Sequence, residues 1–203
     1  MSTSTMMPAP YTVARYVVGV AASAGGLTAL SHLLAQLPAA FPASLLVVQH
    51  LPPTFPSHLV EILGRRTALA VVPGTDGGRL LAGTVYVSPP DMHLIVATNH
   101  RMRLSHSPPT HHCRPSADRL FASFGSSFGR RAIAVVLTGS GCDGAEGAQM
   151  MRRHGGVVVV QDERTAEFPG MPRAAVQAGT VDWVLPLEDI PGALQRLVGQ
   201  ALN

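Results

Sequence analysis

Three reactive side chains, those of Ser23, His50 and Asp143, each follow a short apolar run that is typical of a buried strand. In a parallel sheet the carboxyl ends of the strands meet at one edge, and functional sites form outside that edge. A hydroxyl, an imidazole and a carboxylate gathered there are the parts of a nucleophile, a general base and an orienting acid. The pattern therefore predicts hydrolysis through a covalent intermediate. The three runs are 16–22, 45–49 and 132–137.

Each of these residues also has a simpler structural interpretation. Ser23 and Asp143 precede predicted helices and are favoured N-cap types, while His50 is compatible with an incidental strand end. Their joint placement at one edge favours the catalytic interpretation. Gly25 and Gly26 allow a sharp turn after Ser23, which leaves main-chain N–H groups free to hold an oxyanion. The order Ser, His, Asp and the absence of G-x-S-x-G distinguish the site from that of the α/β-hydrolases.

The elements that must position these residues alternate between strand and helix, so we expect an α/β fold with a mostly parallel, doubly wound sheet flanked by helices. The middle of the chain has short runs separated by turn residues, which predicts an antiparallel hairpin region. Helices are expected at 25–37, 57–66, 117–128, 143–154, after Pro172 and at 187–202. Further strands are expected at 68–72, 157–161 and 182–185, and the hairpins at 84–88, 92–97 and 101–105.

The 203 residues are enough for one domain with a substantial core. Residues 1–14 have little pattern and predict a flexible N-terminal tail, and residues 15–203 predict the catalytic domain. No apolar stretch approaches the ~20 residues of a membrane span, so we expect no membrane insertion. A short apolar run after Arg15 loosely imitates a signal peptide. Cutting there would remove the first strand, so we expect a cytoplasmic protein.

The composition excludes several classes of chemistry. All 15 basic residues are arginine, so neither a Schiff-base lysine nor a GK[ST] phosphate loop is present. The arginines are scattered and aromatics are only 5%, which argues against nucleic-acid binding. The net charge of +3 favours an acidic protein partner. Cys113 and Cys142 do not form the pattern of a disulfide framework.

Five short motifs, in order along nearly the whole chain, resemble the catalytic domain of the chemotaxis protein-glutamate methylesterases (CheB). That resemblance implies a parallel α/β sheet with a Ser-His-Asp triad, hydrolysis of glutamate methyl esters on chemoreceptor helices, and often deamidation of receptor glutamines. We expect no cofactor. The motifs are GVAASAGG (19–26), VQHLPP (48–53), RPSAD (114–118), LTGSGCDG (137–144) and GMPR (170–173).

Matching the motifs residue by residue, the resemblance implies that Ser23 is the nucleophile, His50 the base and Asp143 the orienting acid. It implies oxyanion donors in the backbone amides of Ala24 and Ser140. Position 140 is commonly methionine in this family, and its change to serine makes the substrate preference less certain. Because the contribution is a main-chain N–H, the change need not abolish activity.

The family usually carries an N-terminal receiver domain that controls activity. Only about fifteen residues precede the first strand here, too few for a receiver. We therefore expect either another form of regulation or a longer parent protein. Two further residues are candidates for substrate binding. Arg114 is expected to contact either the substrate or an internal carboxylate such as Asp118. Met171 either borders the site or fills a gap in the core.

We expect no metal site. The stretch from His111 to Cys113 contains potential ligands, but it has no second Cys/His pair at zinc spacing and lies in a Pro-rich loop. The histidines around the hairpins are expected at the surface: His93, His100 and His106. Two functions compete with the protein methylesterase. One is a small-molecule carboxylesterase with the same triad, and the other is a non-catalytic module that binds an anion at a helix start. The sequence does not indicate the oligomeric state.

Overall fold

A computed structural model describes residues 12–50 and 57–199. Its described part is built on a seven-stranded sheet in the order β3-β4-β2-β1-β7-β8-β9, in which every neighbouring pair is parallel. The α/β fold class is confirmed. The strands are β1 (Tyr16–Ala22), β2 (Ala43–Gln49), β3 (Ala70–Pro73), β4 (Thr84–Val87), β7 (Ala132–Val136), β8 (Val157–Gln161) and β9 (Trp183–Leu185).

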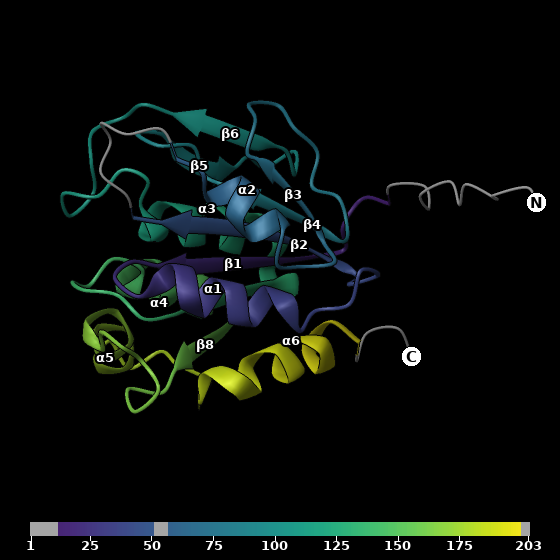
Figure 1. Cartoon of the computed structure of the whole chain (residues 1–203). Coiled ribbons are helices and arrows are strands. Elements are labelled where there is room, and N and C mark those ends of the chain that lie inside the picture. Colours follow the sequence, from purple (N-terminus) through teal and green to yellow (C-terminus); the bar gives the residue numbers. More distant parts are fainter. Residues whose placement is uncertain (1–11, 51–56, 200–203) are drawn as a thin grey trace, which may run out of the picture.

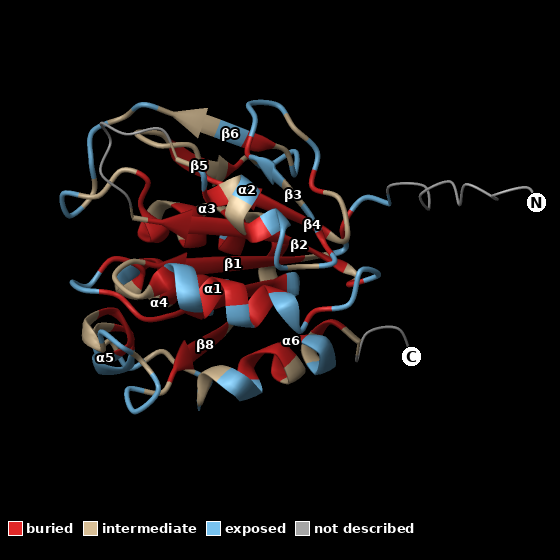
Figure 2. Ribbon diagram, viewed as in Figure 1, coloured by how far each residue is buried: buried red, intermediate tan, exposed pale blue. Residues whose placement is uncertain are grey.

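Helices cover both faces of the sheet (Figure 1). One buried cluster joins the sheet to α1 (Gly26–Ala35), α2 (Leu59–Gly64) and α6 (Ile190–Gly199). A second cluster, on the opposite face, joins it to α3 (Ala117–Phe128), α4 (Ala145–Arg153) and α5 (Gly170–Gln177). A small antiparallel pair, β5 (His93–Val96) and β6 (Met102–Ser105), packs on this second face beside α3. Figure 2 shows the central strands of the sheet buried between these layers.

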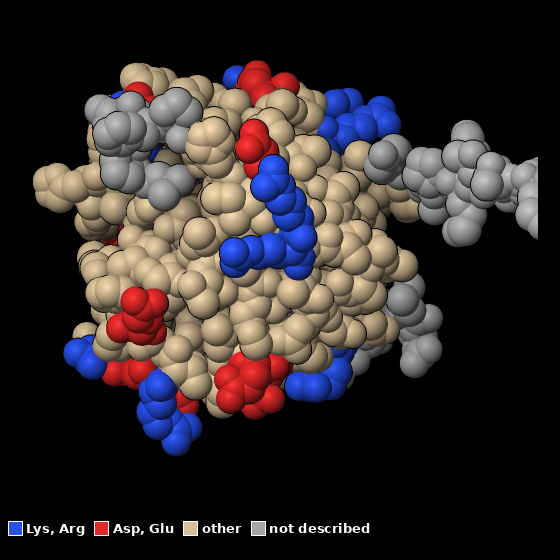
Figure 3. All heavy atoms as spheres, viewed as in Figure 1, with Lys and Arg blue, Asp and Glu red and all other residues tan. Residues whose placement is uncertain are grey.

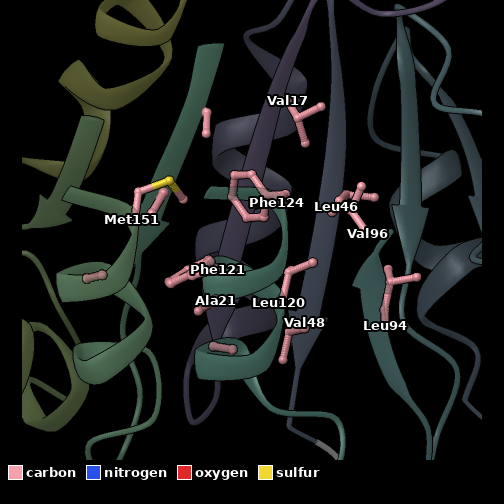
Figure 4. Close-up of a cluster of buried hydrophobic side chains, with 14 of the residues drawn as sticks. Val17, Ala21, Leu46, Val48, Leu94, Val96, Leu120, Phe121, Phe124 and Met151 are labelled. Carbon is pink, nitrogen blue, oxygen red and sulfur yellow. The ribbon is translucent and has the colours of Figure 1, made fainter. Parts of the chain in front are cut away.

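The central strands are almost continuously apolar because they are buried on both faces. On the α3 side of β1, Phe121 and Phe124 meet edge to face with ring centroids 6.0 Å apart (Figure 4). A Cβ at Gly19 would come within 2.5 Å of the Phe124 ring. The glycine in β1 therefore lets α3 approach the sheet closely.

Strand β1 is the point at which the chain reverses its direction across the sheet. From β1 the chain passes to β2 on one side, and it returns later to β7 on the other side. The crevice outside such a switch point is where open α/β sheets bind ligands. β1 and its two neighbours are the strands that end in Ser23, His50 and the loop to Asp143.

One expectation for the middle of the chain was wrong. Residues 84–88 were expected in the antiparallel hairpin region, but β4 lies inside the main sheet, parallel to both β2 and β3. All four residues of β4 are buried, as a strand covered on both faces requires. Only β5 and β6 form an antiparallel pair of named strands in the described residues.

Several predicted boundaries also differ. α4 begins at Ala145 rather than at Asp143, and α5 begins at Gly170, with Pro172 in a first turn that tolerates proline. A 3₁₀ turn, Leu187–Asp189, precedes α6. Residues 1–11 of the expected tail lie outside the described residues. Residues 12–14 pair with residues 80–82 instead of lying loose.

Two surface properties bear on function. No helix within residues 12–50 and 57–199 has both the length and the hydropathy needed to cross a bilayer. On the face shown in Figure 3, acidic and basic side chains stand in small separate groups on a largely uncharged surface. That face therefore offers no dense basic patch of the kind that binds nucleic acid.

Candidate active site

The backbone brings the three predicted segments together at the carboxyl edge of the sheet. The Ser23 amide donates to the Thr138 carbonyl (3.0 Å), which follows β7, and the His50 amide donates to the Ala22 carbonyl (3.1 Å) at the end of β1. Ala22 is the register partner of Gln49. Ser23 and His50 therefore leave adjacent strands at the same level, and the loop that leads to Asp143 starts beside them.

A tight turn places Ser23 at the start of α1. Gly25 has φ +72°, in the left-handed region that favours glycine, and the Gly26 amide donates to the Ser23 carbonyl (2.8 Å). The buried Gln49 side chain donates to the same carbonyl (2.8 Å). A Cβ at Gly26 would collide with the Gln49 amide oxygen. The Gln49 side chain of β2 thus holds the turn in place.

The imidazole of His50 is hydrogen-bonded to the predicted acid. The distance from His50 Nε2 to Asp143 Oδ2 is 2.8 Å, and only 15% of the histidine side chain and 2% of the aspartate side chain are exposed. Burial alone would lower the pKa of His50. The hydrogen bond and charge of Asp143, helped by Cys113, outweigh burial and raise the pKa to about 9. The two side chains therefore form a charge-assisted hydrogen bond that is largely shielded from solvent.

Asp143 is held by four donors. Besides His50, its oxygens accept hydrogen bonds from the Ser116 hydroxyl (2.8 Å) and from the backbone amides of Ala117 (2.6 Å) and Asp118 (3.1 Å). Burial would raise the pKa of Asp143, but these hydrogen bonds, that of His50 first, hold it below its usual value. Asp143 therefore stays ionised and caps α3 rather than its own helix.

The nucleophile side of the site is open. Within the described residues the Ser23 hydroxyl makes no hydrogen bond, and Ser23 is partly exposed. In the neutral imidazole, Asp143 accepts the His50 Nε2–H, so Nδ1 is the nitrogen left with a lone pair. The nearest recorded partner of Nδ1 is the Cys113 sulfur, at 4.0 Å. Among the described residues, His50 is thus hydrogen-bonded to Asp143, and no hydrogen bond joins His50 to Ser23.

Two backbone amides next to Ser23 also lack acceptors. Among the described residues, neither the Ala24 nor the Ser140 N–H donates a hydrogen bond. The loops that carry them are tied together, since the Thr138 hydroxyl donates to the Ala24 carbonyl (3.0 Å). Free amides on a fixed backbone are the components of an oxyanion hole.

The two candidate substrate-binding residues occupy different settings. Met171 is buried at the start of α5, and its amide donates to the Gly139 carbonyl (2.9 Å). A Cβ at Gly139 would collide with the Met171 sulfur and lie 2.8 Å from the Ser23 Cβ, so Met171 packs close to Ser23. Arg114 instead pairs with Asp91 (2.6 Å), not with Asp118. Its role in substrate binding stays a prediction.

Sequence reasoning missed the residues that support Asp143. His93 was expected at the surface but is fully buried. Its Nδ1 accepts the Ser116 amide (3.2 Å) and its Nε2 donates to the Pro108 carbonyl (3.2 Å). Burial, the main cause, lowers the pKa of His93, consistent with a neutral ring that donates once and accepts once. Ser116, immediately before the predicted helix at 117–128, and Asp118, in the first turn of that helix, were the available signal.

Within the described residues, two groups of side chains have ligand types whose atoms lie within 4.8 Å of one another. One is the site itself, with His50, Cys113 and Asp143. The other consists of His111, Asp118 and Glu146, in which His111 and Glu146 are exposed. The expectation of no metal is a prediction that the structure does not test.

Comparison with known proteins agrees with this arrangement. The family model for CheB methylesterase matches residues 18–194. Protein-glutamate methylesterase FrzG of Myxococcus xanthus is 41% identical over 94% of this chain, and a protein-glutamate methylesterase/protein-glutamine glutaminase of Anaeromyxobacter dehalogenans is 43% identical over 93%. The chain spans only 56% and 55% of these relatives.

A solved structure extends the comparison to three dimensions. The catalytic domain of the Thermotoga maritima CheB methylesterase superposes with a TM-score of 0.86 at 35% identity, covering 90% of this chain and 98% of that one. The resemblance found in the five motifs is confirmed, and this chain belongs to the CheB methylesterase family.

Proposed function

We propose that this chain hydrolyses glutamate methyl esters on a protein and releases methanol, using Ser23, His50 and Asp143. The observation that carries the proposal is the 2.8 Å hydrogen bond between His50 Nε2 and Asp143 Oδ2, at the sheet edge where β1 ends in Ser23. The names of the relatives, protein-glutamate methylesterases, support the substrate class.

The first chemical step follows from the tautomer of His50. Asp143 accepts the Nε2–H, so Nδ1 takes the Ser23 proton as Oγ attacks the ester carbonyl. Such hydrogen bonds are often absent or long before substrate binds and tighten in the complex, which accounts for an unpaired serine hydroxyl in the resting site. Asp143 then stabilises the imidazolium.

Collapse of the tetrahedral intermediate completes the reaction. The amides of Ala24 and Ser140 stabilise its oxyanion, each by about 3 kcal/mol. Methanol leaves with the proton that His50 took, and an acyl-enzyme remains on Ser23. A water then attacks the acyl-enzyme and gives a proton to His50, which passes it to the Ser23 oxygen as the glutamate carboxylate is released. Met171 is buried beside Ser23, so a contact with the substrate side chain would require the neighbouring side chains to move.

The substrate proteins follow from the family. We assign them as methylated chemoreceptor helices or related signalling proteins, and we place the enzyme in the cytoplasm. Deamidation of glutamine is a second activity of the same site, because attack of Ser23 on the side-chain amide would give the same acyl-enzyme and release ammonia. Relatives named both methylesterase and glutaminase favour it.

Methanol release from methylated chemoreceptors tests the proposal. The wild type should release methanol, and Ser23→Ala should release none above the uncatalysed rate. Ser126→Ala is the matched control, since Ser126 is exposed on α3 away from the site and should keep full activity. Release by Ser23→Ala would contradict the assignment of the nucleophile.

The same assay separates the competing functions. Turnover of small esters with no release from methylated receptors would support a small-molecule carboxylesterase. If there is no turnover and a fluorophosphonate does not label Ser23, the result would support the non-catalytic anion-binding module.

A further inference from the structure

Asp118 is a buried carboxylate to which the proposed mechanism gives no part. It lies in the first turn of α3, and the residue is only 6% exposed. Its Oδ1 accepts the backbone amides of Gly144 (2.9 Å) and Gly147 (2.7 Å), which begin α4. Asp118 therefore satisfies the free N–H groups of a neighbouring helix.

Asp143 does the reverse. It lies immediately before α4, yet its oxygens accept the amides of Ala117 and Asp118, which begin α3. Asp118 of α3 thus caps α4, and Asp143, which precedes α4, caps α3. We call these two sets of hydrogen bonds the cap exchange. Because Gly144 follows Asp143 directly, Asp118 fixes the backbone next to the residue that orients His50.

The starts of α3 and α4 approach each other closely where the exchange takes place. A Cβ at Gly147 would lie 2.7 Å from both the Cα and the carbonyl oxygen of Asp118. Gly144 has φ +101°, a conformation that other residues rarely adopt. The two glycines let α4 approach α3 until main-chain amides reach the Asp118 carboxylate.

The exchange holds two carboxylates close together in a buried setting, which is unfavourable for a contact that serves stability alone. Burial first, and then the neighbouring charge of Asp143, raise the pKa of Asp118 to about 7 against the lowering effect of the Gly147 and Gly144 amides. Its second oxygen, Oδ2, is buried and has no hydrogen-bond partner in the described residues; His111 Nε2 is 3.8 Å away. Carboxyl groups with perturbed pKa values at the edge of a site are candidates for a functional role.

We propose that Asp118 is a positioning residue, which holds Asp143, and through it His50, in the orientation that catalysis requires. The proposal rests on the proposed function. Loss of the Oδ1 acceptor would release the loop 139–144, which also carries the Ser140 amide. Small displacements of catalytic groups reduce rate more than binding. The kcat for methanol release should therefore fall while KM for the methylated receptor stays nearly constant.

Two substitutions and one matched control test the proposal. Asp118→Ala removes the acceptor and should lower kcat about 100-fold with little change in KM. Asp118→Asn keeps an oxygen acceptor for both amides and should restore kcat to within about threefold. Asp182→Ala is the control, since Asp182 also accepts a buried backbone amide, that of Val158 (2.8 Å), and pairs with Arg152 far from the site. It should lower the melting temperature but leave kcat unchanged.

Several results would overturn the proposal. They are an equal loss of kcat in Asp118→Ala and Asp182→Ala, an unchanged kcat in Asp118→Ala, or a loss above tenfold in a folded Asp118→Asn. The last criterion holds even where Asp118→Ala does not fold.

A second readout does not depend on turnover. The ¹H NMR signal of His50 Nε2–H, hydrogen-bonded to Asp143, should be kept in Asp118→Asn and Asp182→Ala and lost or shifted in Asp118→Ala. If the wild type releases no methanol, the proposed function fails, and this signal still decides the role of Asp118. An unchanged signal in Asp118→Ala would overturn it.

Discussion

The two halves of the site are built in opposite ways. On the acid side, Asp143 is almost fully buried and accepts four hydrogen bonds, from His50 and from three groups at the start of α3. On the nucleophile side, Ser23 is partly exposed, and neither its hydroxyl nor the adjacent Ala24 amide has a partner in the described residues.

This difference shows which part of the site is held in a fixed arrangement before substrate binds. The base is oriented before substrate arrives, so no reorganisation is needed at that end during the reaction. The groups that must bond to the substrate are left free. Mutations on the acid side should therefore change kcat more than KM. Mutations that alter its charges should also change the pH dependence of the activity.

The sharpest way to break the acid side is to replace Asp143 by Asn. Asparagine has one oxygen in place of the two that accept hydrogen bonds in Asp143, and it favours the wrong imidazole tautomer. The kcat should therefore fall about 10⁴-fold. Steady-state methanol release measures the loss, with Asp182→Asn as a control remote from the site. A loss below tenfold would mean that Asp143 does not orient the base.

The pH dependence of kcat/KM tests the charge on the acid side. His50 is a base only when neutral, and its pKa of about 9 lies above the ordinary 6.5. Activity should therefore rise about tenfold per pH unit from pH 7 towards 9 and level off above it. A plateau that begins near pH 6.5 would show that Asp143 does not stabilise the imidazolium in the free enzyme.

Ser116→Ala removes one of the four donors to Asp143 and leaves the two amides of α3 in place. The loss of one hydrogen bond to a charged group should lower kcat about tenfold. Ser126→Ala, an exposed serine on the same helix, should have no effect. Equal activity of the two variants would show that the Ser116 hydroxyl does not contribute to orientation.

The smallest expected effect is at Cys113, which lies 4.0 Å from His50 Nδ1 and helps to raise the pKa of His50. Cys113→Ala should shift the rising limb of the pH profile to lower pH. Cys142→Ala is the matched control, because this exposed cysteine is not among the groups that shift the pKa of His50. A profile that is the same in both variants would assign the whole shift to Asp143.

The sequence predicted features that depend on local patterns. The apolar runs before Ser23 and His50 identified β1 and β2, and the motifs identified the family. The position of β4 was predicted wrongly, because a short run such as 84–88 carries no signal for the strand with which it pairs.

The support of Asp143 was out of reach for a different reason. Ser116 and Asp118 were readable as helix-cap residues, but their partners lie more than twenty residues away, in the next helix and its preceding loop. Those contacts depend on how closely α3 and α4 pack. The burial of His93 depends equally on the docking of β5 against α3, which no local pattern records.

The most direct test of the account is the rate and site of labelling by a fluorophosphonate, read by mass spectrometry of the digested protein. The adduct should map to Ser23 in the wild type. It should be absent in Ser23→Ala, and it should form at least about 100-fold more slowly in His50→Gln and Asp143→Asn. An adduct on another residue, or equal labelling rates in the wild type and His50→Gln, would contradict the claim that these three residues act as one unit.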